Sequence, residues 1–155
     1  MTGWRIVIGA DDAGYEYKEL LRALLEDDPR VAGVVDVGVD ADGHTPYPQV
    51  ASEAARLVAD GEADRGLLVC GTGLGMAIAA NKVRGVRAVT AHDSYSVARS
   101  VLSNDAQILA LGARVIGPEL AKTLVDGWLG LQFDPQSPSS AKVDLIGEIE
   151  KEESA

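Results

Sequence analysis

The chain has 155 residues and a formal net charge of -10, from 24 acidic and 14 basic side chains, and 46% of its residues are hydrophobic. A chain of this length buries roughly 70% of the surface that its unfolded form exposes, so one compact domain needs neither disulfides nor a structural metal. The acidic balance, without a block of Lys or Arg, argues against nucleic acid as a partner. A single cysteine, Cys70, and the absence of an apolar stretch near the roughly 20 residues of a membrane span predict a cytoplasmic protein without a membrane partner.

Short β-branched runs alternate with longer amphipathic segments, which is typical of strand and helix units around a parallel sheet. We expect strands at residues 5–9, 34–38, 66–70, 86–90 and 107–111. We expect helices at residues 15–27, 47–60, 74–82, 94–102 and 118–129. The pattern predicts an α/β fold, a Rossmann-like three-layer sandwich with a five-stranded parallel sheet and ligands at the carboxyl ends of its strands.

The composition changes after residue 131. Residues 132–140 (QFDPQSPSS) are rich in proline and serine, and residues 142–152 resume a helical pattern with Val143, Ile146 and Ile149 on one side. We therefore expect a single domain over residues 1–131, followed by a linker and an extra C-terminal helix over residues 132–155. This helix either packs on its own domain or reaches across to a second subunit.

The first predicted strand runs into residues 9–14 (GADDAG), which place Asp11 and Asp12 at the mouth of the sheet. Two adjacent carboxylates there can hold sugar hydroxyls, bind a metal or transfer protons. One of them can instead cap the following helix, as Asp often does. We do not expect a metal, because no other pair of possible ligands recurs at ligand spacing.

The third predicted strand ends in residues 70–75 (CGTGLG), where three glycines alternate. Such a turn can point backbone N–H groups at an anion, and so bind a phosphate or stabilise an enediolate. The spacing does not fit a dinucleotide fingerprint, and the GK[ST] ending of a nucleotide-triphosphate loop is absent. Taken alone, the glycine turn fits a structural role equally well.

Cys70 is the last residue of this predicted strand and lies beside the glycine turn. A lone strand cysteine is usually a small buried hydrophobe, but this position beside a helix N-terminus favours a thiolate. A thiolate next to an oxyanion site suits attack on a carbonyl or removal of a proton from the adjacent carbon. Attack would need a partner histidine. Neither His44 nor His92 lies in a recognisable Cys/His protease context, so we rank a cysteine hydrolase last.

Two more polar residues follow the later strands. His92 comes after the fourth predicted strand and either binds a ligand or packs with a satisfied ring nitrogen. Arg114 comes after the fifth and is the best candidate for an anion ligand, since guanidinium matches phosphate with two parallel hydrogen bonds. Its alternative role is an ordinary surface ion pair.

Together these segments resemble the ribose-5-phosphate isomerase B family, which includes the galactose-6-phosphate isomerase subunits. The resemblance covers nearly the whole chain and rests on residues 9–14 (GADDAG), 46–48 (PYP), 70–88 (CGTGLGMAIAANKVRGVRA), 103–105 (SND) and 112–121 (GARVIGPELA). It implies a cofactor-free aldose–ketose isomerase that acts on a small phosphorylated sugar. It also implies a homodimer or a dimer of dimers, with each site at a subunit interface.

The resemblance also implies roles for single residues. Cys70 is the base that moves a proton between C1 and C2 through a cis-enediolate, and Thr72 assists transfer between the oxygens. Arg114 and Lys142 bind the phosphate. The substrate-binding positions are Asp11, Asp12, Tyr47, Gly71, Gly73, Leu74, Gly75, Asn81, His92, Ser103 and Asn104.

The chain departs from the family pattern at positions that affect substrate choice. Where ribose-5-phosphate isomerases carry one histidine after the first strand and another before the fifth, this chain has Asp12 and Ser103. A serine cannot replace the histidine that opens the furanose ring. Two arginines that clamp phosphate in the family fall in the Ser137–Pro138 region and at Lys142, which offers a point charge without a planar fork.

A four-carbon sugar phosphate with its terminal hydroxyl esterified closes no stable furanose and needs no ring-opening acid. Residues 92–96 and 102–108 also look like the D-erythrulose-4-phosphate isomerase branch of the family. We therefore expect interconversion of D-erythrulose 4-phosphate and D-erythrose 4-phosphate. The runner-up is interconversion of ribulose 5-phosphate and ribose 5-phosphate. A non-catalytic sugar-phosphate-binding protein is a further alternative, because of the missing histidine and arginines.

Overall fold

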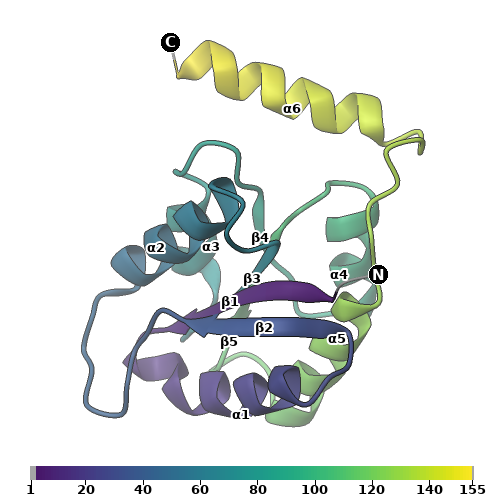
Figure 1. Ribbon diagram of the computed structural model, residues 1–155. Helices are drawn as coiled ribbons and strands as arrows, with labels where there is room; N and C mark the ends of the chain where they lie inside the picture. The colour runs from purple at the N-terminus through teal and green to yellow at the C-terminus, as the bar shows by residue number, and fades with distance from the viewer. Residues whose placement is uncertain (1–2, 155) are drawn as a thin grey trace.

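The computed structural model describes residues 3–154 (Figure 1), so residues 1, 2 and 155 of the expected domain and tail lie outside the described part. Five strands form one parallel sheet: β1 (Trp4–Ala10), β2 (Val31–Asp36), β3 (Arg65–Cys70), β4 (Ala88–Thr90) and β5 (Ile108–Gly112). Their order across the sheet is β2-β1-β3-β5-β4. The order reverses between β1 and β3, and in open α/β sheets ligands bind at such a switch point, beyond the carboxyl ends of the strands.

Helices cover both faces of the sheet, as the predicted three-layer sandwich requires. A short 3-10 helix, η1 (Asp12–Gly14), leads into the first α-helix. On one face pack α1 (Tyr15–Glu26), α4 (Ser94–Leu102) and α5 (Pro118–Leu129), and on the other pack α2 (Tyr47–Ala59) and α3 (Leu74–Ala80). The predicted fold class and the chain order of strands and helices are confirmed.

Each strand differs from its predicted bounds, three of them by a single residue at one or both ends and two, β2 and β4, by more. We expected β2 at residues 34–38, but it begins at Val31 and ends at Asp36. Asp36 Oδ1 accepts a hydrogen bond from the Gly38 N–H at 2.9 Å and turns the chain. We expected β4 to begin at residue 86, but it begins at Ala88. The first backbone donors of this segment have partners outside the sheet: the Val86 N–H donates to the Val83 carbonyl at 3.2 Å, and the Arg87 N–H donates to Gln107 Oε1 at 2.8 Å.

The core is split by the sheet into two apolar layers, and the side chains of each strand alternate between them. Ile6 and Ile8 of β1 pack on the side of α1, α4 and α5, whereas Val7 packs on the side of α2 and α3. β3 is buried along its whole length, as expected of a middle strand in a parallel sheet. By the same alternation, Cys70 lies on the side of α2 and α3.

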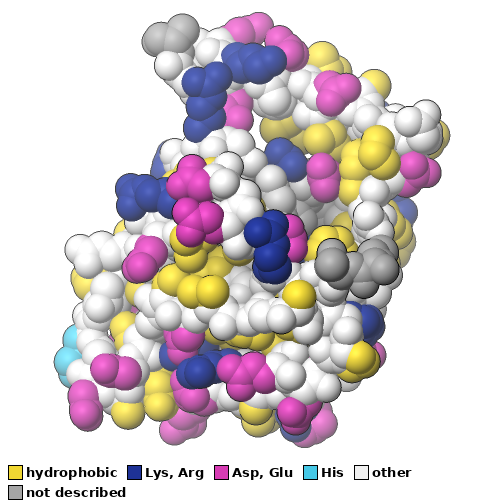
Figure 2. Space-filling view, viewed as in Figure 1, with side chains coloured by type: hydrophobic (Ala, Val, Ile, Leu, Met, Phe, Trp, Pro, Cys, Tyr) yellow, Lys and Arg dark blue, Asp and Glu magenta, His cyan; other side chains and the backbone are white. Residues whose placement is uncertain are grey.

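The last helix, α6 (Ser140–Glu153), lies outside the three layers (Figure 1). None of its residues is buried, and apolar side chains are visible on its surface in Figure 2. Leu145, Ile146 and Ile149 of this helix are exposed. The Gly85 N–H donates a hydrogen bond to Glu150 Oε1 at 3.0 Å, which joins α6 to the loop between α3 and β4. The helix therefore does not bury an apolar face on its own domain. Within residues 3–154, no helix has both the length and the apolar character that crossing a bilayer requires.

Candidate active site

Cys70 ends β3 at the carboxyl edge of the sheet. It pairs with Gly112, the last residue of β5, and its side chain is buried. The Gly73 N–H donates a hydrogen bond to the Cys70 sulfur at 3.1 Å. The sulfur thus has a backbone donor in place, which is the kind of partner that an anionic acceptor uses.

The loop that follows Cys70 is fixed by the neighbouring strands. The Ala113 N–H donates to the Cys70 carbonyl and the Arg114 N–H to the Gly71 carbonyl, each at 2.9 Å. From β4, the Thr90 hydroxyl donates to the Gly73 carbonyl at 2.8 Å. Gly73 itself has a φ of 80°, in the left-handed region that favours glycine. This turn aims the Gly73 N–H back at the sulfur.

Thr72 lies at the exposed side of the same loop. Its Oγ1 accepts a hydrogen bond from the Leu74 N–H at 3.2 Å, where α3 begins. In this bond the Thr72 hydroxyl oxygen is the acceptor, so the hydroxyl proton is available to a ligand. The Leu74 side chain is exposed beside it.

Tyr47, the first residue of α2, lies directly against the same loop. A Cβ atom added to Gly75 would lie 2.6 Å from the Tyr47 Cζ atom. Only glycine at position 75 therefore allows the ring to approach this closely. The fold thus brings together Tyr47 and the Cys70 loop, which lie far apart in the sequence.

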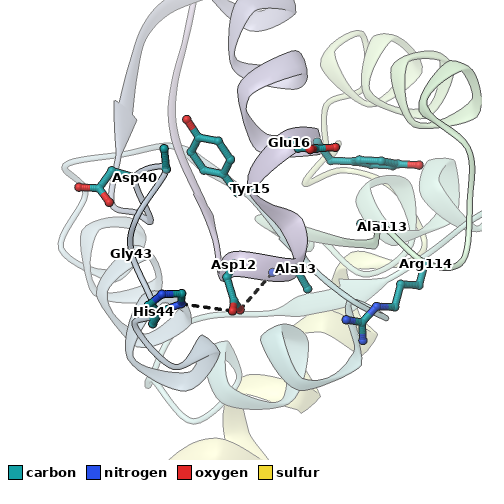
Figure 3. Close-up of a pocket in the computed structure, with 11 residues that line it drawn as sticks. Asp12, Ala13, Tyr15, Glu16, Asp40, Gly43, His44, Ala113 and Arg114 are labelled. Carbon is teal, nitrogen blue, oxygen red and sulfur yellow. Dashed lines mark hydrogen bonds and ion pairs between the residues drawn. The ribbon is translucent and has the colours of Figure 1, made fainter.

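Arg114 borders the loop on another side and lines a pocket of about 490 Å³ (Figure 3). Its Nη1 atom would lie 3.1 Å from a Cβ atom added to Gly71. The ion pairs found within residues 3–154 do not include Arg114. The surface ion pair that the sequence left open is therefore not formed, and the guanidinium is free for an anion.

The two adjacent carboxylates of the first loop take different roles. Asp11 Oδ1 accepts a hydrogen bond from the Gly14 N–H at 3.1 Å and so caps η1. Asp12 lines the pocket of Figure 3, where its Oδ2 atom lies 3.5 Å from His44 Nδ1. Helix capping thus describes Asp11, whereas Asp12 faces the space that a ligand would fill. No cluster of three or more His, Cys, Asp or Glu side chains suited to a metal is found among residues 3–154.

His92 follows β4 and supports the carboxyl edge of β5. Its Nε2 atom accepts a hydrogen bond from the Gly112 N–H at 2.9 Å, which assigns the proton of the neutral ring to Nδ1. Burial lowers the pKa of His92, and the nearby Asp93 carboxylate opposes that shift. The sequence left two roles open for His92, ligand binding and packing. The structure shows the packing role, with one ring nitrogen hydrogen-bonded to the backbone.

Asn81, at the end of α3, is held by the backbone of Ala88. Its Nδ2 donates to the Ala88 carbonyl and its Oδ1 accepts from the Ala88 N–H, both at 2.8 Å. These two bonds fasten α3 to β4 and use both ends of the amide. Asn81 therefore supports the site through the fold, and its amide does not point to the Cys70 loop.

Three of the expected site residues lie away from this edge. Ser103 and Asn104 come between α4 and β5, at the amino edge of the sheet, whereas Cys70 pairs with Gly112 at the carboxyl edge. The whole of β5 separates the two edges, at about 3.3 Å per residue. Ser103 Oγ accepts a hydrogen bond from Arg99 Nε at 2.6 Å. Lys142 is exposed on α6, outside the layers.

Two residues at the carboxyl edge had no predicted role. Thr90 ends β4 and anchors the glycine loop, and His44 lies in the segment between β2 and α2, paired with Asp12. Thr90 could have been found as a hydroxyl at the carboxyl end of a predicted strand. His44 carries no local signal, because only the fold brings it to Asp12.

A doubly wound sheet with a thiol and a glycine loop at its switch point defines a class of small α/β enzymes, and comparison with known proteins identifies the family. Residues 6–146 match the model of the Ribose/Galactose Isomerase family, so the chain belongs to that family. The protein is a sugar-phosphate aldose–ketose isomerase. This excludes the cysteine hydrolase and the non-catalytic binding protein.

Relatives and solved structures agree with this assignment. The chain is 67% identical to D-erythrulose-4-phosphate isomerase 2 of Mycolicibacterium smegmatis, over 92% of this chain and 94% of the relative. It is 46% identical to D-erythrulose-4-phosphate isomerase of Pectobacterium atrosepticum, over 96% of each chain. The structure of Clostridium thermocellum ribose-5-phosphate isomerase B superposes with a TM-score of 0.90 at 42% identity, over 96% of this chain and 98% of that chain.

Proposed function

We propose that the protein interconverts D-erythrulose 4-phosphate and D-erythrose 4-phosphate, with Cys70 as the base. The hydrogen bond from the Gly73 N–H to the Cys70 sulfur is the observation that carries the base assignment. Two relatives named for D-erythrulose 4-phosphate support the four-carbon substrate. Ser103 also supports it, because a serine is a poor acid for opening a furanose ring.

The reaction needs no other reactant, because it only moves protons and electron pairs within the substrate and to and from Cys70 and Thr72. The Cys70 thiolate takes a proton from C1 of the ketose, and the electron pair of that C–H bond forms the C1–C2 double bond. The carbonyl oxygen at C2 becomes the oxyanion of a cis-enediolate, which backbone N–H groups of the 71–75 loop stabilise. Thr72 carries the proton of the O1 hydroxyl to O2. The Cys70 thiol then returns its proton to C2, and C1 becomes the aldehyde.

The phosphate group is assigned to Arg114. This guanidinium lies beside Gly71 and has no carboxylate partner among the described residues. A planar guanidinium binds phosphate oxygens with two parallel hydrogen bonds. In a chain with a net charge of -10, such a local cation is required for a dianionic substrate.

We also propose that each site is completed by a second copy of the chain, in a homodimer or a dimer of dimers. Ser103 and Asn104 lie at the sheet edge opposite Cys70, and Lys142 lies on a helix outside the layers. A second copy can present all three to the Cys70 edge. The exposed Leu145, Ile146 and Ile149 of α6 support this arrangement, because a partner surface would cover them. Of the described residues, 3–131 then form the isomerase domain, and 132–154 form an arm that packs on the partner.

The decisive experiment compares kcat/KM for D-erythrulose 4-phosphate and D-ribulose 5-phosphate with the same enzyme preparation. A clear preference for the four-carbon sugar supports the proposal. An equal or greater kcat/KM for the five-carbon sugar overturns it in favour of ribose-5-phosphate isomerase activity, the second candidate, which the likeness to the Clostridium thermocellum structure favours. Ser103→His should raise kcat/KM for ribose 5-phosphate relative to the wild type, because it supplies an acid for ring opening.

A further inference from the structure

The pocket of Figure 3 has an unfavourable charge for the ligand assigned to it. Three carboxylates, those of Asp12, Glu16 and Asp40, line it together with one guanidinium, that of Arg114. A phosphate dianion entering this lining meets more negative than positive charge. The remaining side chain in the lining that can add a positive charge is His44.

His44 lies where an added positive charge would help. Its Nδ1 atom is 3.5 Å from Asp12 Oδ2, and the two side chains form an ion pair only when the imidazole carries its proton. In that form Asp12 is compensated, and the Nε2–H group remains as a donor. Figure 3 shows His44 and Arg114 on opposite sides of the pocket, with Asp12 between them. The His44 side chain is 81% exposed, so it can turn toward a ligand.

We propose, on the basis of the proposed function, that protonated His44, held by Asp12, is a second cationic contact for the phosphate of the substrate, opposite Arg114. Anion binding is then coupled to proton uptake at His44. Because Asp12 repels an anion unless His44 is protonated, this pair of side chains makes the affinity for phosphate depend on pH.

The titratable and charged groups that line the pocket together with His44 come from every element around it. They are Asp12 from η1, Tyr15, Glu16 and Tyr17 from α1, Asp40 from the same loop as His44, and Arg114 from the loop after β5. Among these residue types, histidine is the one that ordinarily changes its charge between about pH 6 and pH 8. Because His92 is bonded to the Gly112 N–H beside this lining, the comparison of the wild type with a His44 variant is what assigns a pH dependence of anion affinity to His44.

The test uses sulfate, whose charge does not change over this pH range, and measures its dissociation constant by titration calorimetry at constant ionic strength. For the wild-type protein, affinity should weaken about threefold to tenfold between pH 6 and pH 8.5. The His44→Asn variant should bind sulfate weakly at both pH values, and its affinity should not change between them. Asp12→Asn should bind sulfate more tightly than the wild type at pH 8.5. Asp42→Asn, a matched loss of charge on the same loop outside the pocket lining, should follow the wild-type curve.

A wild-type affinity that does not change with pH, or a His44→Asn variant that keeps the wild-type slope, overturns the proposal. Circular dichroism of each variant shows whether it is folded, and the exposure of His44 favours a folded variant. The two proposals fail differently. If the protein isomerises its sugar phosphate but His44→Asn keeps the slope, only the role of His44 is wrong. If neither sugar is isomerised but sulfate affinity depends on His44, the anion site stands and the proposed function fails.

Discussion

The backbone N–H of Gly73 donates a hydrogen bond to the sulfur of Cys70 at 3.1 Å. The two residues lie at either end of one tight loop, and the left-handed conformation of Gly73 closes it. The proposed base and the proposed donors for the enediolate oxygen are thus built on the same few residues. Changes that move this loop should therefore reduce turnover without exposing the core.

Thr90→Val tests how far the glycine loop depends on its anchor. The substitution removes the 2.8 Å hydrogen bond to the Gly73 carbonyl and keeps the side-chain shape. We expect stability to fall by about 1 kcal/mol and kcat to fall by about tenfold, because the oxyanion donors lose their alignment. Urea unfolding and steady-state kinetics measure the two effects.

Thr123→Val is the matched control. The Thr123 hydroxyl donates to the Glu119 carbonyl at 3.0 Å within α5, away from the site. This variant should lose no more stability than Thr90→Val and should keep its kcat. Equal kcat values for the two variants would show that the Thr90 bond does not align the loop.

Gly75→Ala tests the placement of Tyr47. The new methyl group would lie 2.6 Å from the Tyr47 Cζ atom, so the ring must move away from the Cys70 loop. We expect kcat/KM to fall about tenfold or more, since small displacements of positioned groups are costly. Gly127→Ala in α5 has open space around its methyl group and should leave kcat/KM unchanged, while it stabilises the helix by up to about 1 kcal/mol. If both variants kept wild-type kinetics, Tyr47 would have no part in the site.

The periodic parts of the fold could be predicted from the sequence, because strands and helices each bury one regular pattern of side chains. The same pattern placed Cys70 and Arg114 at the carboxyl edge, since Cys70 ends one buried strand and Arg114 lies two residues after the end of another. The division of roles between Asp11 and Asp12 could not be predicted, because it depends on which carboxylate meets the Gly14 N–H. The contact between Asp12 and His44 joins two loops and has no local signal.

Acidification should weaken the fold through His92. Burial lowers the pKa of His92 in the folded chain below its ordinary value near 6.5. The unfolded chain therefore binds the proton more readily, and the stability that neutral His92 contributes is present above this ordinary value and is lost as the pH falls through the folded pKa. Protonation also removes the acceptor for the Gly112 N–H.

Urea unfolding at about pH 7.5 and pH 5.5 measures this effect. His92→Gln keeps an acceptor that does not titrate, so its stability should fall less between the two pH values than that of the wild type. Asp28, Asp64 and Asp93 have lowered pKa values, so their contributions should be lost only in more acidic solution. If the wild type and the His92→Gln variant lost the same stability between the two pH values, the loss could not be assigned to His92.

Mixing two inactive variants tests whether the site is shared between subunits. Cys70→Ala removes the proposed base, and Asn104→Ala changes a residue at the opposite edge of the sheet. In a mixed dimer with shared sites, one site carries both changes and the other carries neither. After the two variants are unfolded and refolded together, activity should therefore return to about a quarter of the wild-type value. If two folded, dimeric variants recovered no activity on mixing, each site would belong to a single chain.

The central claim is that Cys70 is the base, and the most direct test measures transfer of solvent deuterium into D-erythrulose 4-phosphate. The wild-type enzyme should exchange the proton that moves between C1 and C2. Cys70→Ala and Cys70→Ser should lower both exchange and kcat by about 100-fold or more while retaining the wild-type circular dichroism spectrum. A folded Cys70→Ala variant that exchanged deuterium at a rate near that of the wild type would contradict the account.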